Sequence, residues 1–300
     1  MSRSVIVAVC ATPGKPLGDT DDARHEYNLS AAETLLAEAA EKGADIACLP
    51  ETFAIQGIPG AGENPRWYEP FPNGPTSARF AQIARRHRLY LIVPILGLEN
   101  NIRRNIALVF DRNGKYLGGY RKVHVTVVEH KTWKIVPGDE WPIFELDFGR
   151  IGITICYDAL FPEAFRILAL KGAQILFHPT VYSMFGEVGW EAMMKSRAID
   201  NCVYLCTANY GIGDADPWMP GMCLNRSSII GPDGIFLADR GRYRGVALAE
   251  LDLDRPRMVL SGVNYRDKIW NHRRPDTYGE LATYGYWVQN ESPIDPPGEG

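Results

Sequence analysis

The sequence predicts an α/β fold in which helices cover the outer faces of β-sheets. Short runs that are apolar throughout alternate with stretches whose apolar residues recur at helical spacing, and the scheme occurs twice along the chain. Strands of this kind need cover on both faces, so helices should lie outside and two sheets can pack against each other inside. No low-complexity linker divides the two halves. We therefore expect one domain over residues 1–300.

The first half contains three apolar runs that predict strands, at Val5–Ala11, Asp45–Leu49 and Tyr90–Leu96. A helix is expected between the first two runs, where apolar residues recur at helical spacing from Leu29 to Ala39. After a further apolar run, the Asn-Gly pair at 113–114 predicts a β-hairpin. This half of the chain is therefore expected to alternate strands and helices and to end in an antiparallel pair of strands.

The second half repeats this scheme after a hairpin around Phe148–Arg150. Pro162 suits the first turn of a helix, which marks one boundary clearly. The expected elements are, in order, a strand over Ile151–Cys156, a helix from Pro162 to about Leu170, a strand over Ile175–His178, a helix over Trp190–Asp200, a strand over Val203–Ala208, a hairpin over Gly231–Gly234 and a strand over Val246–Leu251. Residues from about 262 to 300 form an extension rich in aromatic residues, which we expect to pack on the body or on a partner subunit.

Composition narrows the possible partners and the cellular setting. The formal net charge of −4 gives no broad attraction to phosphate backbones or anionic lipid, so we expect no nucleic-acid partner. No apolar stretch approaches the ~20 residues that span a bilayer, so we expect no membrane partner. The six cysteines lie mostly inside apolar, strand-like runs, which argues against a disulfide scaffold and indicates a cytoplasmic protein.

Three reactive side chains follow apolar runs that read as strands: Glu51, Lys122 and Cys156. Taken singly, each has an ordinary reading as a surface glutamate, a solvated lysine or a buried core cysteine. Together they supply a carboxylate, an ammonium and a thiol, which can break an amide-like carbon–nitrogen bond through a thioester. At a strand-to-helix turn, Cys156 would also feel the positive end of the helix, which favours the thiolate.

The three segments resemble the carbon–nitrogen hydrolase family, also called the nitrilase superfamily, whose catalytic Glu, Lys and Cys occur in this order. The likeness continues through Phe161-Pro162-Glu163 and Ser196-Arg197-Ala198 to the Gly231–Gly234 segment, so it covers nearly the whole chain. It implies a four-layer αββα sandwich that forms a homodimer or a higher homo-oligomer through its outer helices. It also implies hydrolysis of a linear, non-peptide C–N bond.

The resemblance also assigns roles to residues. Glu51 would be the general base, Cys156 the nucleophile, and Lys122 with the backbone N–H of Tyr157 would stabilise the oxyanion. The family often adds a second glutamate between its lysine and its cysteine. Glu129 is our choice, with Glu145 as the alternative. No metal or other cofactor is required.

The residues after the cysteine narrow the substrate class that the resemblance implies. Nitrile-cleaving members usually place Trp-Glu after the cysteine, whereas this chain has Tyr157-Asp158, which favours a small-molecule amide or an N-carbamoyl (ureido) substrate. Enzymes for N-carbamoyl-D-amino acids carry two arginines where this chain has Ala159 and Leu160. Activity on a nitrile and a catalytically inactive scaffold stay as alternatives.

Aromatic and histidine side chains near the predicted site have two readings each. Trp133, Tyr182 and Trp190 are expected to form substrate-binding walls together with Tyr157, although core packing is an equal alternative for the first three. A cysteine-protease dyad would need His124, His130 or His178 as its base, and we disfavour that reading. Cys202 and Cys206 lack a second ligand pair, so core packing is favoured over zinc binding.

Overall fold

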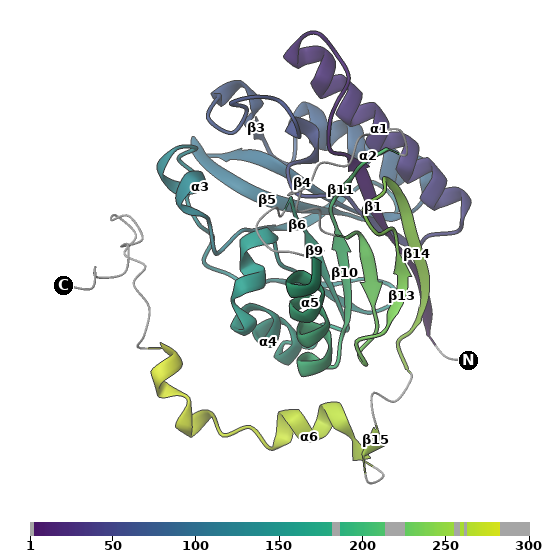
Figure 1. The fold of residues 1–300 in the computed structure, drawn as a ribbon, viewed down its shortest axis with the longest axis vertical. Helices are drawn as coiled ribbons and strands as arrows, with labels where there is room; N and C mark the ends of the chain where they lie inside the picture. The colour runs from purple at the N-terminus through teal and green to yellow at the C-terminus, as the bar shows by residue number, and fades with distance from the viewer. Residues whose placement is uncertain (1–2, 182–186, 214–225, 255–258, 261–262, 283–300) are drawn as a thin grey trace, which may run out of the picture.

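Two mixed β-sheets face each other between two layers of helices (Figure 1). The computed structural model describes residues 3–181, 187–213, 226–254, 259–260 and 263–282. No helix in these ranges is long and apolar enough to cross a bilayer.

The first sheet has eight strands, of which six form a continuous path in the order β11-β1-β2-β4-β5-β6. β14 pairs with β1 and β3 pairs with β4 outside that path. Pairing is parallel from β1 through β2 to β4 and antiparallel from β4 through β5 to β6. The strands are β1 (Ser4–Pro13), β2 (Ile46–Cys48), β3 (Glu69–Pro70), β4 (Tyr90–Glu99), β5 (Ile102–Phe110), β6 (Tyr116–Arg121), β11 (Tyr210–Gly211) and β14 (Gly245–Asp252).

The second sheet has six strands in the order β13-β12-β10-β9-β8-β7. Its centre is parallel, from β8 through β9 to β10, and antiparallel strands flank that centre. The strands are β7 (Ile143–Glu145), β8 (Arg150–Ile153), β9 (Ile175–Pro179), β10 (Tyr204–Ala208), β12 (Ser228–Ile230) and β13 (Phe236–Asp239). A small separate pair follows, β15 (Val259–Leu260) with β16 (Val263–Asn264).

The longer helices lie on the outer faces of the two sheets: α1 and α2 contact the first, and α4 and α5 the second (Figure 1). The α-helices are α1 (Asp21–Glu41), α2 (Pro75–His87), α3 (Val127–Lys131), α4 (Pro162–Leu170), α5 (Glu187–Asn201) and α6 (Tyr265–Asn271). The 3₁₀ helices are η1 (Phe53–Ile55), η2 (Pro65–Trp67), η3 (Cys156–Leu160), η4 (Pro275–Thr277) and η5 (Gly279–Ala282).

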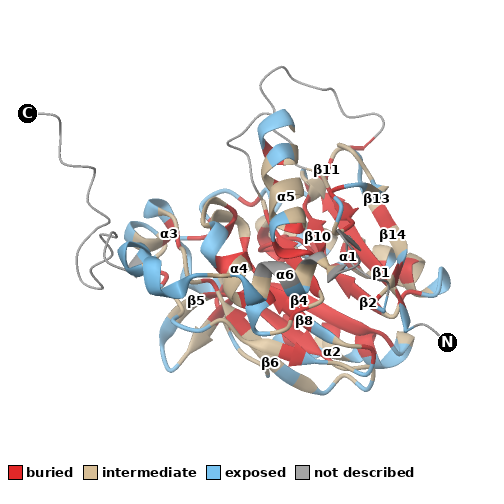
Figure 2. Cartoon of the chain, turned by 90° about the horizontal axis from the view of Figure 1, so that it is seen from below, coloured by how far each residue is buried: buried red, intermediate tan, exposed pale blue. Residues whose placement is uncertain are grey.

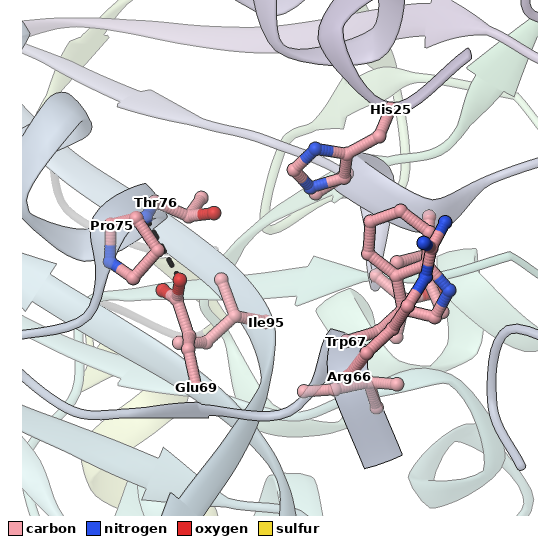
Figure 3. Close-up of a pocket in the computed structure, with 11 residues that line it drawn as sticks. His25, Arg66, Trp67, Glu69, Pro75, Thr76 and Ile95 are labelled. Carbon is pink, nitrogen blue, oxygen red and sulfur yellow. Dashed lines mark hydrogen bonds between the residues drawn. The ribbon is translucent and has the colours of Figure 1, made fainter. Parts of the chain in front are cut away.

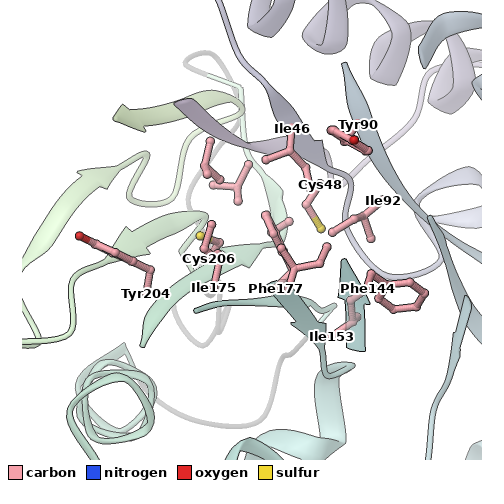
Figure 4. Close-up of a cluster of buried hydrophobic side chains, with 14 of the residues drawn as sticks. Ile46, Cys48, Tyr90, Ile92, Phe144, Ile153, Ile175, Phe177, Tyr204 and Cys206 are labelled. Carbon is pink, nitrogen blue, oxygen red and sulfur yellow. The ribbon is translucent and has the colours of Figure 1, made fainter. Parts of the chain in front are cut away.

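Alternating side chains along the strands explain why four layers form. On β1, Val7 and Val9 enter the core between the sheets, whereas Ala8 and Cys10 enter the core under α1 and α2. Figure 4 shows side chains of both sheets meeting in the layer between them, with Cys48 from the first and Phe177 from the second. Because side chains alternate along a strand, a strand that is apolar throughout buries both of its faces.

Burial follows the same plan (Figure 2). Buried residues concentrate on the strands, and the exposed ones lie mainly on loops and on the outer faces of the helices. The predicted α/β class and the stacking of two sheets are therefore confirmed.

One strand of the second sheet is shorter than the sequence predicts. The strand predicted over Ile151–Cys156 ends already at Ile153, and Cys156 is the first residue of η3. The apolar run continues past the strand because Ile155 is buried in the inter-sheet core without belonging to the ladder.

In the C-terminal extension, α6 contacts the body through Arg266, whose Nη2 donates to the carbonyl of Ala173 at 3.1 Å. The single-domain organisation stays a prediction.

Candidate active site

A buried ionic group lies beyond the ends of β2 and β6. The Lys122 ammonium donates to Glu51 Oε1 at 2.8 Å and to both carboxylate oxygens of Glu129 at 2.9 Å. Their side chains are 1%, 3% and 6% exposed, respectively. Buried charges are costly unless they are paired, and here one ammonium lies between two carboxylates. The structure thus brings Glu51, Lys122 and Glu129 into direct contact.

Local structure fixes each member of this group. Glu51 follows Pro50, just after β2. Lys122 is the first residue after β6, and its backbone N–H donates to the carbonyl of Asn105 at 2.9 Å. Glu129 lies in the first turn of α3, where its carboxylate accepts from the N–H of Thr126 at 2.8 Å and completes a capping box. Backbone hydrogen bonds therefore fix the positions of Lys122 and Glu129, which lie on either side of the N-cap residue of α3.

Asn105 joins the two carboxylates, and the sequence reasoning missed it. Its Nδ2 donates to Glu51 Oε1 at 2.7 Å and to Glu129 Oε1 at 2.8 Å. Its residue is 1% exposed. Asn105 lies in β5, which pairs with β6, the strand that leads to Lys122. A polar residue at a buried strand position was the feature that could have identified Asn105 as a site residue.

Cys156 begins η3 with a left-handed backbone, at a φ of 44°. Thr52, directly after Glu51, is also left-handed, at a φ of 48°. Non-glycine residues with such backbones are uncommon and tend to occur at functional sites. Both turns thus redirect the chain next to a reactive side chain.

Burial raises the pKa of the Cys156 thiol well above its ordinary value, and the carboxylate of Glu51 raises this pKa further. Lys122 and a hydrogen bond with Thr180 act in the opposite direction but do not prevail. The expected effect of the helix terminus is therefore outweighed by burial, and the resting thiol is protonated. The same interactions place Cys156 within electrostatic reach of Glu51, Lys122 and Glu129.

Lys122 and Glu129 each favour the charged form. Burial tends to lower the pKa of Lys122, but the two glutamates outweigh it and hold this pKa well above the ordinary lysine value. Burial tends to raise the pKa of Glu129, but Lys122, Thr126 and Asn105 together hold it below the ordinary value. Lys122 therefore stays an ammonium and Glu129 a carboxylate.

The turn of Cys156 is tied to the segment of Lys122 by Asp158, which is fully buried. One Asp158 oxygen accepts from the Tyr120 hydroxyl at 2.7 Å and from the N–H of Ile155 at 2.7 Å. The other accepts from the N–H of His124 at 3.1 Å and contacts its Nδ1 at 2.8 Å. Tyr120 and His124 flank Lys122 in sequence. Asp158 thus links the lysine segment of the first sheet to the cysteine turn of the second.

The end of β9 approaches the site from the second sheet. Thr180 hydrogen-bonds with Cys156, and the N–H of Val181 donates to Glu51 Oε2 at 3.2 Å. Two successive residues thus contact the thiol and the carboxylate. Neither was singled out from the sequence, since a threonine and a valine after an apolar strand give no chemical signal.

The remaining predicted site residues lie in different surroundings. Glu145, the alternative second glutamate, is exposed on β7 and pairs with Arg150. Trp190 is 1% exposed within the core between α4, α5 and the second sheet. Trp133 is half-buried against Gly62. Tyr157 lies in η3 with its ring edge-to-face against Phe161, 5.5 Å between centroids. The predicted wall residue Tyr182 lies outside the described residues.

The three histidines near the site have partners other than the thiol. His178 Nδ1 is 2.8 Å from the hydroxyl of Thr154, and His124 is bound to Asp158. His130 Nδ1 lies 3.3 Å from the carbonyl of Ile135. These contacts favour a carboxylate over an imidazole as the base for Cys156. In the part of the chain that the structure describes, no group of three His, Cys, Asp or Glu residues is arranged to hold a metal ion.

A small pocket of about 120 Å³ adjoins the Glu51 turn through Thr52 (Figure 3). Glu69, one of its lining residues, accepts from the N–H groups of Thr76 and Ser77 at the start of α2. Arg66 lies over the ring of Trp67 at 4.1 Å. His25 also lines this pocket, whose lining includes none of Glu51, Lys122, Glu129 and Cys156.

Comparison with known proteins gives a family and a set of relatives. The sequence model of the family Carbon-nitrogen hydrolase matches residues 6–258. The chain is 31% identical over 260 residues to the omega-amidase NIT2 of Xenopus tropicalis, a match that covers 84% of this chain and 91% of the relative. It is 32% identical over 249 residues to the deaminated glutathione amidase of Synechocystis, a match that covers 77% of this chain and 88% of the relative.

The fold is also found among solved structures. A variant of the amidase from Nesterenkonia sp. AN1, which carries the product of Michael addition of acrylamide at its active-site cysteine, superposes with a TM-score of 0.73. The match covers 92% of this chain and 99% of that one, at 23% sequence identity. At this identity the likeness supports the fold alone.

Proposed function

Because this chain belongs to the carbon–nitrogen hydrolase family, we propose that it is an amidase that cleaves a linear, non-peptide amide through a cysteine thioester. The observation that carries the proposal is the buried group of Glu51, Lys122 and Glu129 within electrostatic reach of Cys156. The names of the two relatives, an omega-amidase and a deaminated glutathione amidase, favour an amide over a ureido compound or a nitrile.

In the first half of the reaction, Glu51 takes the proton of the Cys156 thiol while sulfur attacks the substrate carbonyl carbon. The C=O electron pair moves onto oxygen, and Lys122 with the N–H of Tyr157 stabilises this oxyanion. When the oxyanion collapses, the C–N bond breaks and Glu51 returns its proton to the leaving nitrogen. Ammonia or an amine departs, and the acyl group stays on sulfur as a thioester.

In the second half, Glu51 takes a proton from water as the water oxygen attacks the thioester carbon. Collapse of the second oxyanion breaks the C–S bond and releases a carboxylic acid. The sulfur regains its proton from Glu51, which restores the starting state. Glu129 keeps its charge throughout and holds the Lys122 ammonium in place.

Substrate walls and assembly complete the proposal. Tyr157 and Trp133 are proposed to contact the substrate, whereas the buried position of Trp190 favours a role in core packing. A homodimer or higher homo-oligomer is expected from the outer helices and is measurable by light scattering of the purified chain.

The test is ammonia release from a panel of primary amides, ureido acids, carbamoyl amines and simple nitriles. We expect primary amides to react fastest and the Cys156→Ala variant to release none, with an unchanged thermal transition. Cys10→Ala is the matched control, because Cys10 is buried under the outer helices away from the ionic group. Ammonia release by Cys156→Ala at the wild-type rate would refute the proposal. Faster release from nitriles or ureido acids would change the substrate class.

A further inference from the structure

Among the residues that the structure describes, one oxygen of Glu51 accepts two hydrogen bonds and the other accepts one. Oε1 accepts from Lys122 Nζ at 2.8 Å and from Asn105 Nδ2 at 2.7 Å. Oε2 accepts at 3.2 Å from the backbone N–H of Val181, at the long end of the hydrogen-bond range. The two oxygens therefore differ in how readily they can accept a proton.

Asn105 creates this asymmetry with a single nitrogen. An amide NH₂ carries two hydrogens, so Asn105 Nδ2 can serve Glu51 Oε1 and Glu129 Oε1 at once. Its Oδ1 is buried and has no hydrogen-bond partner among the described residues, so the carboxylates alone set the orientation of the amide. The flipped amide would place Oδ1 against two carboxylate oxygens, which is repulsive.

We propose that Asn105 is a positioning residue: it clamps the carboxylates of Glu51 and Glu129 on either side of Lys122 and so directs the proton of Cys156 to Oε2 of Glu51. The inference rests on the proposed amidase function and adds an atom-level assignment to it. In the step concerned, the S–H bond breaks and an Oε2–H bond forms as sulfur bonds to the carbonyl carbon. The same Oε2 proton then goes to the leaving nitrogen.

The clamp also keeps like charges apart. The two carboxylates share one ammonium, so the group carries a net charge of −1 in a buried place. Without the amide, Glu51 could rotate and present either oxygen to Lys122 or to the thiol. Loss of Asn105 should therefore slow the proton transfers while the substrate still binds, because its amide is bound to the two carboxylates.

The first test separates turnover from binding. Asn105→Ala is expected to lower kcat by roughly 10- to 100-fold and to change KM by less than about threefold, since positioned acid–base groups contribute on that scale. A kcat within about threefold of wild type would overturn the proposal. The wild-type enzyme, assayed alongside, reports on the amidase function separately, so failure of one does not imitate failure of the other.

The second test uses pH and a near-isosteric change. In Asn105→Asp, the new carboxyl can donate one hydrogen bond while protonated, and once ionised it repels both glutamates. The ratio of variant to wild-type kcat should therefore fall as pH rises, by about tenfold or more between pH 5 and pH 8. A ratio that does not depend on pH would contradict the clamp, because a purely structural defect has no such signature.

Asn28 offers a matched control. Asn28 is likewise buried, at 2% exposed, and its Nδ2 also donates to two oxygens, the backbone carbonyls of Ala54 and Gln56 at 3.1 and 2.9 Å. Asn28→Asp should weaken folding without a pH-dependent loss of kcat relative to wild type. The same pH-dependent loss in Asn28→Asp would mean that the signature reports buried charge in general and would overturn the assignment.

A measurement on the folded wild type covers the case in which the variants do not fold. Both side-chain amide protons of Asn105 should be shifted downfield in ¹H–¹⁵N spectra and exchange slowly, because each is bound to a carboxylate. Glu51→Gln should move one of the two resonances strongly and the other little. Fast exchange of both protons, or equal movement of both, would refute the clamp.

Discussion

The two sheets make unlike contributions to the site. The first sheet and the segments that follow its strands supply the three members of the ionic group: Glu51 after β2, Lys122 after β6 and Glu129 on α3. The second sheet supplies Cys156, the proposed nucleophile, and the uncharged contacts of Thr180 and Val181. The first sheet therefore contributes a cluster of paired ions, whereas the second sheet contributes a protonated thiol. Reactivity therefore depends on how the sheets are held together.

Two features join the halves. Asp158 bonds the cysteine turn to residues on both sides of Lys122, and the inter-sheet core fixes the spacing of the layers. The comparison predicts that damage within the ion cluster, at the link and in the inter-sheet core affects turnover in that descending order.

The largest effect is expected inside the first half. Glu51→Gln keeps the size of the side chain and removes the proposed base, so kcat should fall by roughly 10²- to 10⁴-fold. Steady-state ammonia release measures this loss. A kcat of Glu51→Gln within about tenfold of wild type would show that turnover does not depend on the Glu51 carboxylate.

An intermediate effect is expected at the link. Asp158→Asn removes a charge that accepts hydrogen bonds from Tyr120, Ile155 and His124. Small misplacements of reacting groups cost on the order of 10²-fold, so kcat/KM should fall roughly 10- to 100-fold. The control is Asp233→Asn, at an exposed hairpin turn of the second sheet, where steady-state kinetics should not change. Equal losses in the two variants would contradict the role of the link.

A smaller effect is expected from the packing between the sheets. Phe177→Leu alters the inter-sheet core and Phe110→Leu alters the core under the outer helices. Each should lower the free energy of unfolding by about 1–2 kcal/mol, measured by denaturant titration. Only Phe177→Leu should also lower kcat, by a few-fold, because it changes the layer that spaces Cys156 from Glu51. Equal kcat values for Phe177→Leu and Phe110→Leu would contradict the expectation that turnover depends on the inter-sheet core in particular.

The smallest effect on activity is expected at His178, a residue of the second sheet that mainly affects stability in acid. Burial lowers the pKa of His178 in β9 to about 4, from an ordinary value of 6.5. The unfolded chain then binds the proton more readily, so stability falls as pH drops from 6.5 toward 4, by up to roughly 3 kcal/mol. His178→Asn should flatten this part of the stability curve with little change in turnover at neutral pH.

Glu129 contributes in a different pH window. Its pKa is depressed in the folded state, so its stabilising contribution is present above the ordinary value of 4.5 and is lost as pH falls below it. Glu129→Gln should therefore leave the loss between pH 6.5 and 4.5 in place. If Glu129→Gln removed the loss of stability between pH 6.5 and 4.5, then Glu129, and not His178, would be responsible for that loss.

Much of the architecture could be predicted from the sequence, because burial on both faces of a strand leaves a continuous apolar run. The start of α4 at Pro162 was predicted correctly for a local reason, since proline suits a first helical turn. The end of β8 was not, because Ile155 is buried beyond the ladder and extends the run. An apolar pattern reports burial and does not report where hydrogen bonding stops.

The site could be predicted in part. Charged or nucleophilic side chains at strand ends are visible in a sequence, and Glu51, Lys122, Glu129 and Cys156 do converge. Asn105 and Asp158 were missed as site members because their importance comes from partners that are distant in sequence. The protonated state of Cys156 was also missed, since desolvation depends on the packing of the whole fold.

The layer between the sheets has a consequence for how relatives of this chain can diverge. Side chains such as Ile153 and Phe177 carry no chemistry, yet they lie in the core between the sheet that leads to Glu51 and the sheet that leads to Cys156. A lineage could accumulate volume changes there and drift toward weak catalysis with Glu51, Lys122 and Cys156 all intact. Inspection of the reactive residues alone would then mistake a silent relative for a working enzyme.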